Sequence, residues 1–192
     1  MPTLVMMHGM TGTAEMMRPF AEKILPQGWT LIVPEASFEH PSRGFTWWRY
    51  EDGDQPGRRI LTATELSDVD SSLLKLSNLM PDDDLVLGGF SQGGAMAQEL
   101  LQFDHRVIGV IAMGTRAVRP LELRQRLLDI PTAKMLWMHG EGDHRVSLEA
   151  GLEVPQLFEE AGWSVTRMQH SKGHMIPIEF HFSVKDWLET LS

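Results

Sequence analysis

The fold is decided by the stretch Asp84-Leu85-Val86-Leu87-Gly88-Gly89-Phe90-Ser91-Gln92-Gly93-Gly94-Ala95-Met96-Ala97. The apolar run 85–87 is typical of a buried parallel strand, and residues 95–97 open a helical pattern. Ser91 therefore lies at a strand-to-helix turn. The five residues 89–93 match the G-x-S-x-G pattern of a nucleophile elbow, in which the serine hydroxyl is presented at a sharp turn.

The two glycines of this pattern have a physical reason. Strand and helix backbones crowd the positions two before and two after Ser91, so these positions need residues without a Cβ atom. The helix that begins at Gln92 directs free N–H groups toward Ser91, and the Gln92 N–H is the first expected donor to an oxyanion. An alternative interpretation is a flexible glycine-rich turn that carries an incidental serine.

Length and composition restrict the class of protein. The 192 residues suffice for a sizeable core, and we expect a single domain over residues 1–192. A net charge of −9 argues against a nucleic-acid partner and against docking on anionic lipid. The absence of cysteine excludes disulfides, thiolate metal sites and a cysteine nucleophile. There is no leader pattern and no apolar run of about 18 residues, which predicts a cytoplasmic protein without stable membrane insertion.

Strand and helix patterns alternate along the rest of the chain. Further strands are expected at 4–7, 29–33, 107–113, 133–138 and 163–169. This alternation predicts an α/β fold: a mostly parallel sheet of about six strands, helices on both faces and a minimal cap.

Local signals place several helix ends. Thr62-x-x-Glu65 is a capping box, and Pro19 is expected in the first turn of its helix. Ser147 is expected to cap a helix in which Gly151 and Pro155 predict a kink or break.

A serine nucleophile needs a base, which must come from elsewhere in the chain. We prefer His174, which follows the last strand and precedes the closing helix, and keep His170 as the alternative. The imidazole needs a carboxylate to orient it. Asp143, just past a strand, is preferred over Glu141.

Two further histidines are expected to be structural rather than catalytic. His8 and His139 stand at strand ends and are expected to be buried and hydrogen-bonded. No pair among His139, His144 and His174 has the i, i+4 helical spacing of a zinc site, so we expect neither a metal nor a cofactor.

The order nucleophile, acid, base is that of the α/β-hydrolase fold. A second oxyanion donor should come from the loop after the first strand, where the Met10 N–H is the candidate. Residues 35–61 form a long loop without periodicity that contains Phe45, Trp47, Trp48 and Tyr50. These aromatic side chains either wall a binding cleft, which we favour, or cover the core.

With these features together, the sequence resembles the small carboxylesterases related to acyl-protein thioesterases and lysophospholipases. The pieces that carry the resemblance are His8-Gly9-Met10-Thr11-Gly12, Gly89-Phe90-Ser91-Gln92-Gly93-Gly94, His139-Gly140 with Asp143 and Val146, and Gly173-His174-Met175-Ile176-Pro177. The resemblance implies a serine esterase for small esters or thioesters. It also implies an aromatic loop at Trp47-Trp48 beside the site, and we expect Thr11 and Met175 to contact substrate too.

The chain departs from that family where Met10 and Thr11 replace Leu and Gly, where Gly114-Thr115 replaces Ser-Gly, and where Ser147 replaces Pro. These changes affect the expected shape of the acyl pocket.

The leading hypothesis is hydrolysis of small carboxylic esters with short to medium acyl groups by Ser91, His174 and Asp143. Thioesterase and lysophospholipase activities would use the same chemistry. A different class is a non-catalytic ligand-binding module on a hydrolase scaffold. The expected partner is a small-molecule ester, and the chain is expected to be a monomer or homodimer.

Overall fold

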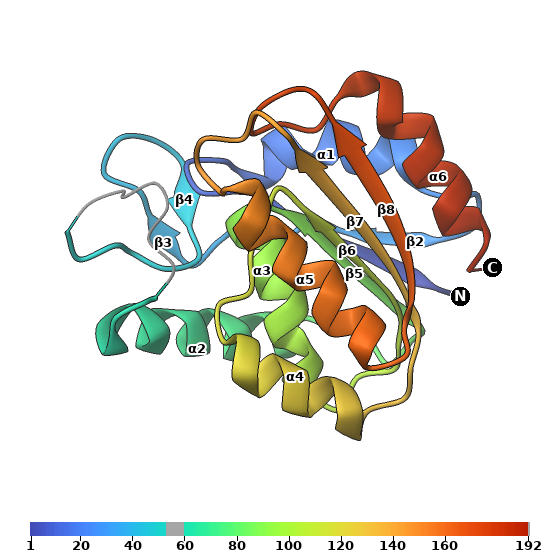
Figure 1. Ribbon diagram of the computed structural model, residues 1–192, viewed down its shortest axis with the longest axis horizontal. Helices are drawn as coiled ribbons and strands as arrows, with labels where there is room; N and C mark the ends of the chain where they lie inside the picture. The colour runs from blue at the N-terminus through green and yellow to red at the C-terminus, as the bar shows by residue number, and fades with distance from the viewer. Residues whose placement is uncertain (53–59, 192) are drawn as a thin grey trace.

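A parallel β-sheet organises the structure, which is a computed structural model that describes residues 1–52 and 60–191. Within these residues six strands pair in the order β2-β1-β5-β6-β7-β8 (Figure 1). Their bounds are Thr3–Met7 (β1), Thr30–Ile32 (β2), Leu85–Phe90 (β5), Val107–Met113 (β6), Lys134–Gly140 (β7) and Ser164–His170 (β8). Each neighbouring pair is parallel. The predicted fold class is therefore confirmed.

Helices connect the strands and cover both faces of the sheet (Figure 1). Their bounds are Ala14–Ile24 (α1), Ala63–Ser77 (α2), Gln92–Glu99 (α3), Pro120–Asp129 (α4), Leu148–Glu160 (α5) and His181–Glu189 (α6). Helices α1 and α6 pack on one face, and α2 to α5 pack on the other. Short 3₁₀ turns at Leu100–Gln102 and Ile178–Phe180 extend α3 and precede α6.

The first strand shows how the two cores divide. Leu4 and Met6 belong to the core under α1 and α6, whereas Val5 and Met7 belong to the core under α2 to α5. All four are fully buried. Because both faces of the sheet are covered, the strand reads as a continuous apolar run rather than as an alternating pattern.

Two predicted helix starts are confirmed, and one prediction was wrong. The capping box before α2 is present, and the Ser147 hydroxyl accepts a hydrogen bond from the Ala150 amide at 3.2 Å. Pro19, however, lies inside α1 and not in its first turn. The helix begins earlier because the Thr13 hydroxyl caps it by accepting the Met16 amide at 3.1 Å.

For α5 we predicted a kink or break, and a break is absent, since the helix is continuous from Leu148 to Glu160 despite Gly151 and Pro155. Gly151 is explained by packing: a Cβ atom there would lie 2.5 Å from the His139 ring. The glycine lets the helix approach β7 closely, and its carbonyl accepts a hydrogen bond from the Trp137 indole at 2.9 Å.

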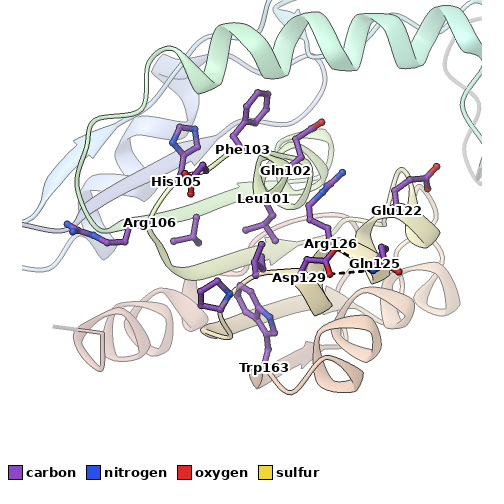
Figure 2. A pocket seen from close by; sticks show the side chains of 14 residues that line it. Leu101, Gln102, Phe103, His105, Arg106, Glu122, Gln125, Arg126, Asp129 and Trp163 are labelled. Carbon is purple, nitrogen blue, oxygen red and sulfur yellow. Dashed lines mark hydrogen bonds between the residues drawn. The ribbon is translucent and has the colours of Figure 1, made fainter.

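One pocket lies at the amino-terminal edge of the sheet. It has a volume of about 660 Å³, and its lining includes Val107, Pro131 and Trp163, which stand at or just before the starts of β6, β7 and β8 (Figure 2). Ser91 follows the opposite end of β5. This pocket is therefore remote from the strand-to-helix turn.

The turn depends on close backbone contact between α3 and the sheet. A Cβ atom on Gly93 would overlap the carbonyl oxygen of Met7, which belongs to the buried backbone of β1 and cannot move away. We expect Gly93→Ala to lower the free energy of unfolding by about 3 kcal/mol, as overpacking does in a rigid core. Chemical denaturation followed by circular dichroism measures this.

The matched control for this variant is Gly142→Ala, where the added atom would lie 3.5 Å from the Lys172 carbonyl oxygen, an ordinary contact. It should change stability by no more than about 0.5 kcal/mol. Equal stability of the two variants would contradict the packing argument.

Candidate active site

Ser91 occupies a backbone conformation that non-glycine residues rarely adopt. Its φ is 55° and its ψ is −120°. Such strain persists only where the surroundings impose it. Here the Ser91 amide donates to the Met113 carbonyl at 2.8 Å, and the Thr115 hydroxyl donates to the Ser91 carbonyl at 2.7 Å. A Cβ atom on Gly89 would overlap Gly93, which agrees with the crowding predicted around the serine.

The structure brings the three preferred residues together in one hydrogen-bonded chain. His174 Nε2 lies 3.0 Å from Ser91 Oγ, and His174 Nδ1 lies 2.6 Å from Asp143 Oδ2. Each comes from the loop after a different strand: Ser91 after β5, Asp143 after β7 and His174 after β8. These loops meet because the carboxyl ends of parallel strands share one edge of the sheet.

Asp143 is fixed by its other oxygen as well. Its Oδ1 accepts the Arg145 and Val146 amides at 2.8 and 2.9 Å, and its side chain is fully buried. Burial alone would raise the pKa of this carboxyl group, but the hydrogen bonds from His174 and the two amides outweigh burial and hold the pKa below its usual value. The side chain is therefore an ionised, oriented carboxylate at neutral pH.

The alternative residues lie in other contacts. The Glu141 carboxylate is at the exposed surface, where it accepts a hydrogen bond from Gln169 at 2.8 Å. His170 packs against the Phe180 ring, with the ring centroids 6.0 Å apart. The hydrogen bond to Ser91 is made by His174 and not by His170.

His8 and His139 are both buried at strand ends, as expected. His8 Nε2 accepts the Ala36 amide at 3.1 Å, and its Nδ1 donates to the Gly9 carbonyl at 2.8 Å. His139 Nε2 donates to the Val146 carbonyl at 2.9 Å. Burial lowers the pKa of both imidazoles, so they are neutral structural groups at pH 7.

The two expected oxyanion donors are amides near Ser91. Gln92 is the first residue of α3, where backbone N–H groups lack a partner within the helix. On either side of Met10, the Thr11 amide donates to the Phe45 carbonyl and the Gly12 amide donates to the Gly9 carbonyl. The Met10 amide has no acceptor among residues 1–52 and 60–191. It therefore remains available to a ligand.

Sequence reasoning missed the role of the Gln92 side chain. Its Oε1 accepts the Thr46 hydroxyl at 2.8 Å and the Trp47 amide at 2.9 Å, and its Nε2 donates to the Trp48 carbonyl at 3.2 Å. The side chain thus fastens the aromatic loop to the start of α3. Its partners lie far from it along the chain, so no local sequence pattern signals this role.

The aromatic loop differs from the expected cleft wall. The side chains of Trp47 and Trp48 are only 1% and 2% exposed and belong to the core under α2 to α5. The Trp47 indole donates a hydrogen bond to the His8 carbonyl at 2.8 Å, which fixes the start of the loop that contains Met10. Residues 53–59 of this long loop lie outside the described residues.

A pocket of about 220 Å³ lies on the Met10 side of the turn. Its lining comprises His8, Gly9, Met10, Thr11, Gly12, Met16, Met17, Phe20, Phe90 and Ile176. The pocket adjoins the serine, because a Cβ atom on Gly9 would lie 3.3 Å from the Ser91 Cβ atom. Thr11, with a strained φ of 66°, lines this pocket. Met175 is 44% exposed and precedes the lining residue Ile176.

Two negative findings apply to the described residues. Among them no group of three or more histidine and carboxylate side chains is arranged to hold a metal ion. None of their helices combines the length and apolar character that crossing a membrane requires.

The sheet order, the serine at the strand-to-helix turn and the adjoining imidazole define the class of α/β hydrolases. Solved structures of other proteins support this assignment of the fold. Acyl-protein thioesterase 2 of Zea mays has a TM-score of 0.79 at 21% identity, covering 99% of this chain and 93% of the maize chain. SOBER1 of Arabidopsis thaliana has a TM-score of 0.75 at 17% identity, covering 99% of this chain and 98% of that one. At these identities the likeness shows the fold alone.

The chain belongs to the phospholipase/carboxylesterase family, whose model matches residues 1–192. The resemblance inferred from the sequence is thereby confirmed. A protein of Oryza sativa subsp. japonica named "Probable carboxylesterase" is 27% identical over 118 residues, which cover 57% of this chain and 42% of the rice protein. The chain thus spans less than half the length of this relative.

The Gln92 side chain yields a stability prediction. Truncation in Gln92→Ala leaves the buried Trp47 amide without its acceptor, which we expect to cost about 2 kcal/mol of unfolding free energy. The control is Gln102→Ala, because Gln102 is exposed and makes one hydrogen bond, to the Glu99 carbonyl at 3.0 Å. Urea denaturation of both variants measures the difference, and equal midpoints would refute the anchoring role.

Proposed function

We propose that the protein is a serine carboxylesterase that hydrolyses small carboxylic esters with short to medium acyl groups through an acyl-enzyme. One observation carries the proposal: His174 hydrogen-bonds Ser91 Oγ through one ring nitrogen and the ionised, buried Asp143 through the other. A serine hydroxyl becomes nucleophilic when an oriented base can accept its proton.

In the proposed mechanism, Ser91 Oγ attacks the ester carbonyl carbon while His174 Nε2 takes the hydroxyl proton. The carbonyl oxygen becomes an oxyanion and accepts hydrogen bonds from the Met10 and Gln92 amides. The imidazolium, stabilised by Asp143, then gives its proton to the departing alcohol. A water molecule attacks the acyl-enzyme by the reverse sequence, which releases the acid and restores Ser91.

The proposed substrate size follows from the pocket beside Ser91. Its volume of about 220 Å³ corresponds to about seven water-sized groups. Three methionines line it, and their flexible thioethers adapt to acyl groups of different shape. Thr11 and Met175 are the proposed substrate contacts, whereas buried Trp47 and Trp48 would act only by supporting the loop.

Thioester hydrolysis is the second candidate. It would proceed through the same acyl-enzyme, and a solved structure of the same fold is named an acyl-protein thioesterase. The family description also includes phospholipases, so a lysophospholipid is a further candidate ester. An oxygen ester and a thioester of the same acid, assayed side by side, distinguish ester hydrolysis from thioester hydrolysis. A lysophospholipid is assayed separately.

The triad assignment is tested by four purified variants assayed with a short-chain aryl ester. Ser91→Ala should lower kcat/KM by at least about 10³-fold. Asp143→Asn should lower it by about 10⁴-fold, because the imidazole loses its orienting carboxylate. Glu141→Gln is the matched control and should retain activity within about twofold, since the exposed Glu141 side chain hydrogen-bonds Gln169 and not His174. His170→Gln separates the two candidate bases and should also retain activity.

Loss of activity in Glu141→Gln with retention in Asp143→Asn would reverse the choice of carboxylate. Hydrolysis by Ser91→Ala at the wild-type rate would refute the mechanism. An inactive wild-type protein that nevertheless binds esters would support the non-catalytic module instead.

A further inference from the structure

A second imidazole lies beside the Asp143 carboxylate. His139, near the end of β7, has a fully buried side chain, and its Nε2 atom lies 3.7 Å from Asp143 Oδ2. Its ring stacks on the Trp137 ring, with the centroids 5.7 Å apart and the planes at 7°. From α5, a Cβ atom on Gly151 would lie 2.5 Å from the same ring. The His139 ring is therefore confined between β7 and α5.

An imidazole in this place has a cost for folding. His139 Nε2 donates to the Val146 carbonyl at 2.9 Å, so Nδ1 of the neutral ring carries the lone pair. That Nδ1 atom is shielded from solvent and has no hydrogen-bond partner within residues 1–52 and 60–191. A buried acceptor without a donor lowers stability, whereas an apolar side chain would fill the space without this cost. The contact made by the Nε2–H group explains why a histidine stands here.

That contact fixes the segment that holds Asp143. Residues 143–146 belong to neither a strand nor a helix, so the backbone groups of Val146 depend on side chains for their partners. The Val146 carbonyl accepts from His139, and the Val146 amide donates to Asp143 Oδ1 at 2.9 Å. The other carboxylate oxygen, Oδ2, lies 2.6 Å from His174 Nδ1. One chain of hydrogen bonds thus runs from His139 through Val146 and Asp143 to His174.

We propose that His139 is a positioning residue of the triad: through Val146 it keeps Asp143 against the Nδ1 side of His174. This inference rests on the proposed esterase function, in which His174 is the base. Asp143 orients that base, and a displacement of about 1 Å in such a constellation can cost about 10²-fold in rate. His139 thereby affects the reaction without touching the substrate.

The test compares His139→Phe with His139→Gln. Phenylalanine keeps an aromatic ring beside Trp137 but has no N–H group, whereas the terminal amide of glutamine supplies an N–H donor to Val146. His139→Leu removes the same donor with a smaller side chain, and it is used if His139→Phe does not fold. The matched control is His105→Phe, because His105 lies just before β6 at the opposite edge of the sheet, where its Nε2 atom is 3.0 Å from Ser77 Oγ.

The first measurement needs no substrate. Proton NMR of protein labelled with ¹⁵N-histidine reports the proton on His174 Nδ1, whose resonance a short hydrogen bond to a carboxylate moves downfield. The signal is assigned by its loss in His174→Gln. We expect it to move upfield in His139→Phe, to return toward the wild-type position in His139→Gln, and to stay in place in His105→Phe.

Kinetics with a short-chain aryl ester should follow the NMR signal. His139→Phe should lower kcat by at least about tenfold while KM changes by less than about threefold, because the base is misplaced but the substrate pocket is not. His139→Gln should recover most of the lost kcat. A role in stability alone would lower the thermal midpoint without moving the His174 signal of the folded protein.

An unmoved His174 signal in folded His139→Phe, or in folded His139→Leu, would overturn the positioning role, whatever the activity. Equal shifts in His139→Phe and His139→Gln would also overturn it, because the N–H group would then not be responsible. If the wild type hydrolysed no ester, the esterase proposal would fail. The NMR comparison would still decide whether His139 positions Asp143.

Discussion

A strained backbone at Ser91 is the constraint on which the rest of the structure depends. A φ of 55° costs a non-glycine residue about 1 to 3 kcal/mol, and the surroundings must compensate for it. They do so through the hydrogen bonds that fix both Ser91 peptide groups and through the close contact of Gly89 with Gly93. The serine hydroxyl is thereby directed away from the sheet, toward the loops that follow β7 and β8.

Those loops bring groups with different electrostatic requirements to one place. Asp143 is kept ionised in a buried position because two amides and His174 supply the hydrogen bonds that water would otherwise provide. The His174 side chain, in contrast, remains partly exposed. Gln92 joins this arrangement to the fold, since it follows Ser91 directly and its side chain holds the loop of Trp47 and Trp48. Site geometry and core packing are therefore not separable at this residue.

Much of this arrangement was predictable from sequence because it rests on local patterns. Apolar runs gave the strands, and the glycines around Ser91 gave the turn. The placement of Asp143 and His174 followed from the rule that loops after parallel strands meet at one sheet edge.

What could not be predicted depends on contacts between distant segments. The burial of Trp47 and Trp48 depends on hydrogen bonds to Gln92 and His8, which no periodicity reveals. The need for a glycine at position 151 of α5 comes from the His139 ring, which leaves no room for a Cβ atom there.

The central claim is that Ser91 is activated by its contact with His174. Covalent labelling by a fluorophosphonate, followed by peptide mapping with mass spectrometry, tests this claim most directly, because the reagent reports the nucleophile without any assumption about substrate. The account predicts one phosphonyl adduct, on Ser91, and a loss of labelling in His174→Gln. An adduct on another residue, or labelling of His174→Gln at the wild-type rate, would contradict it.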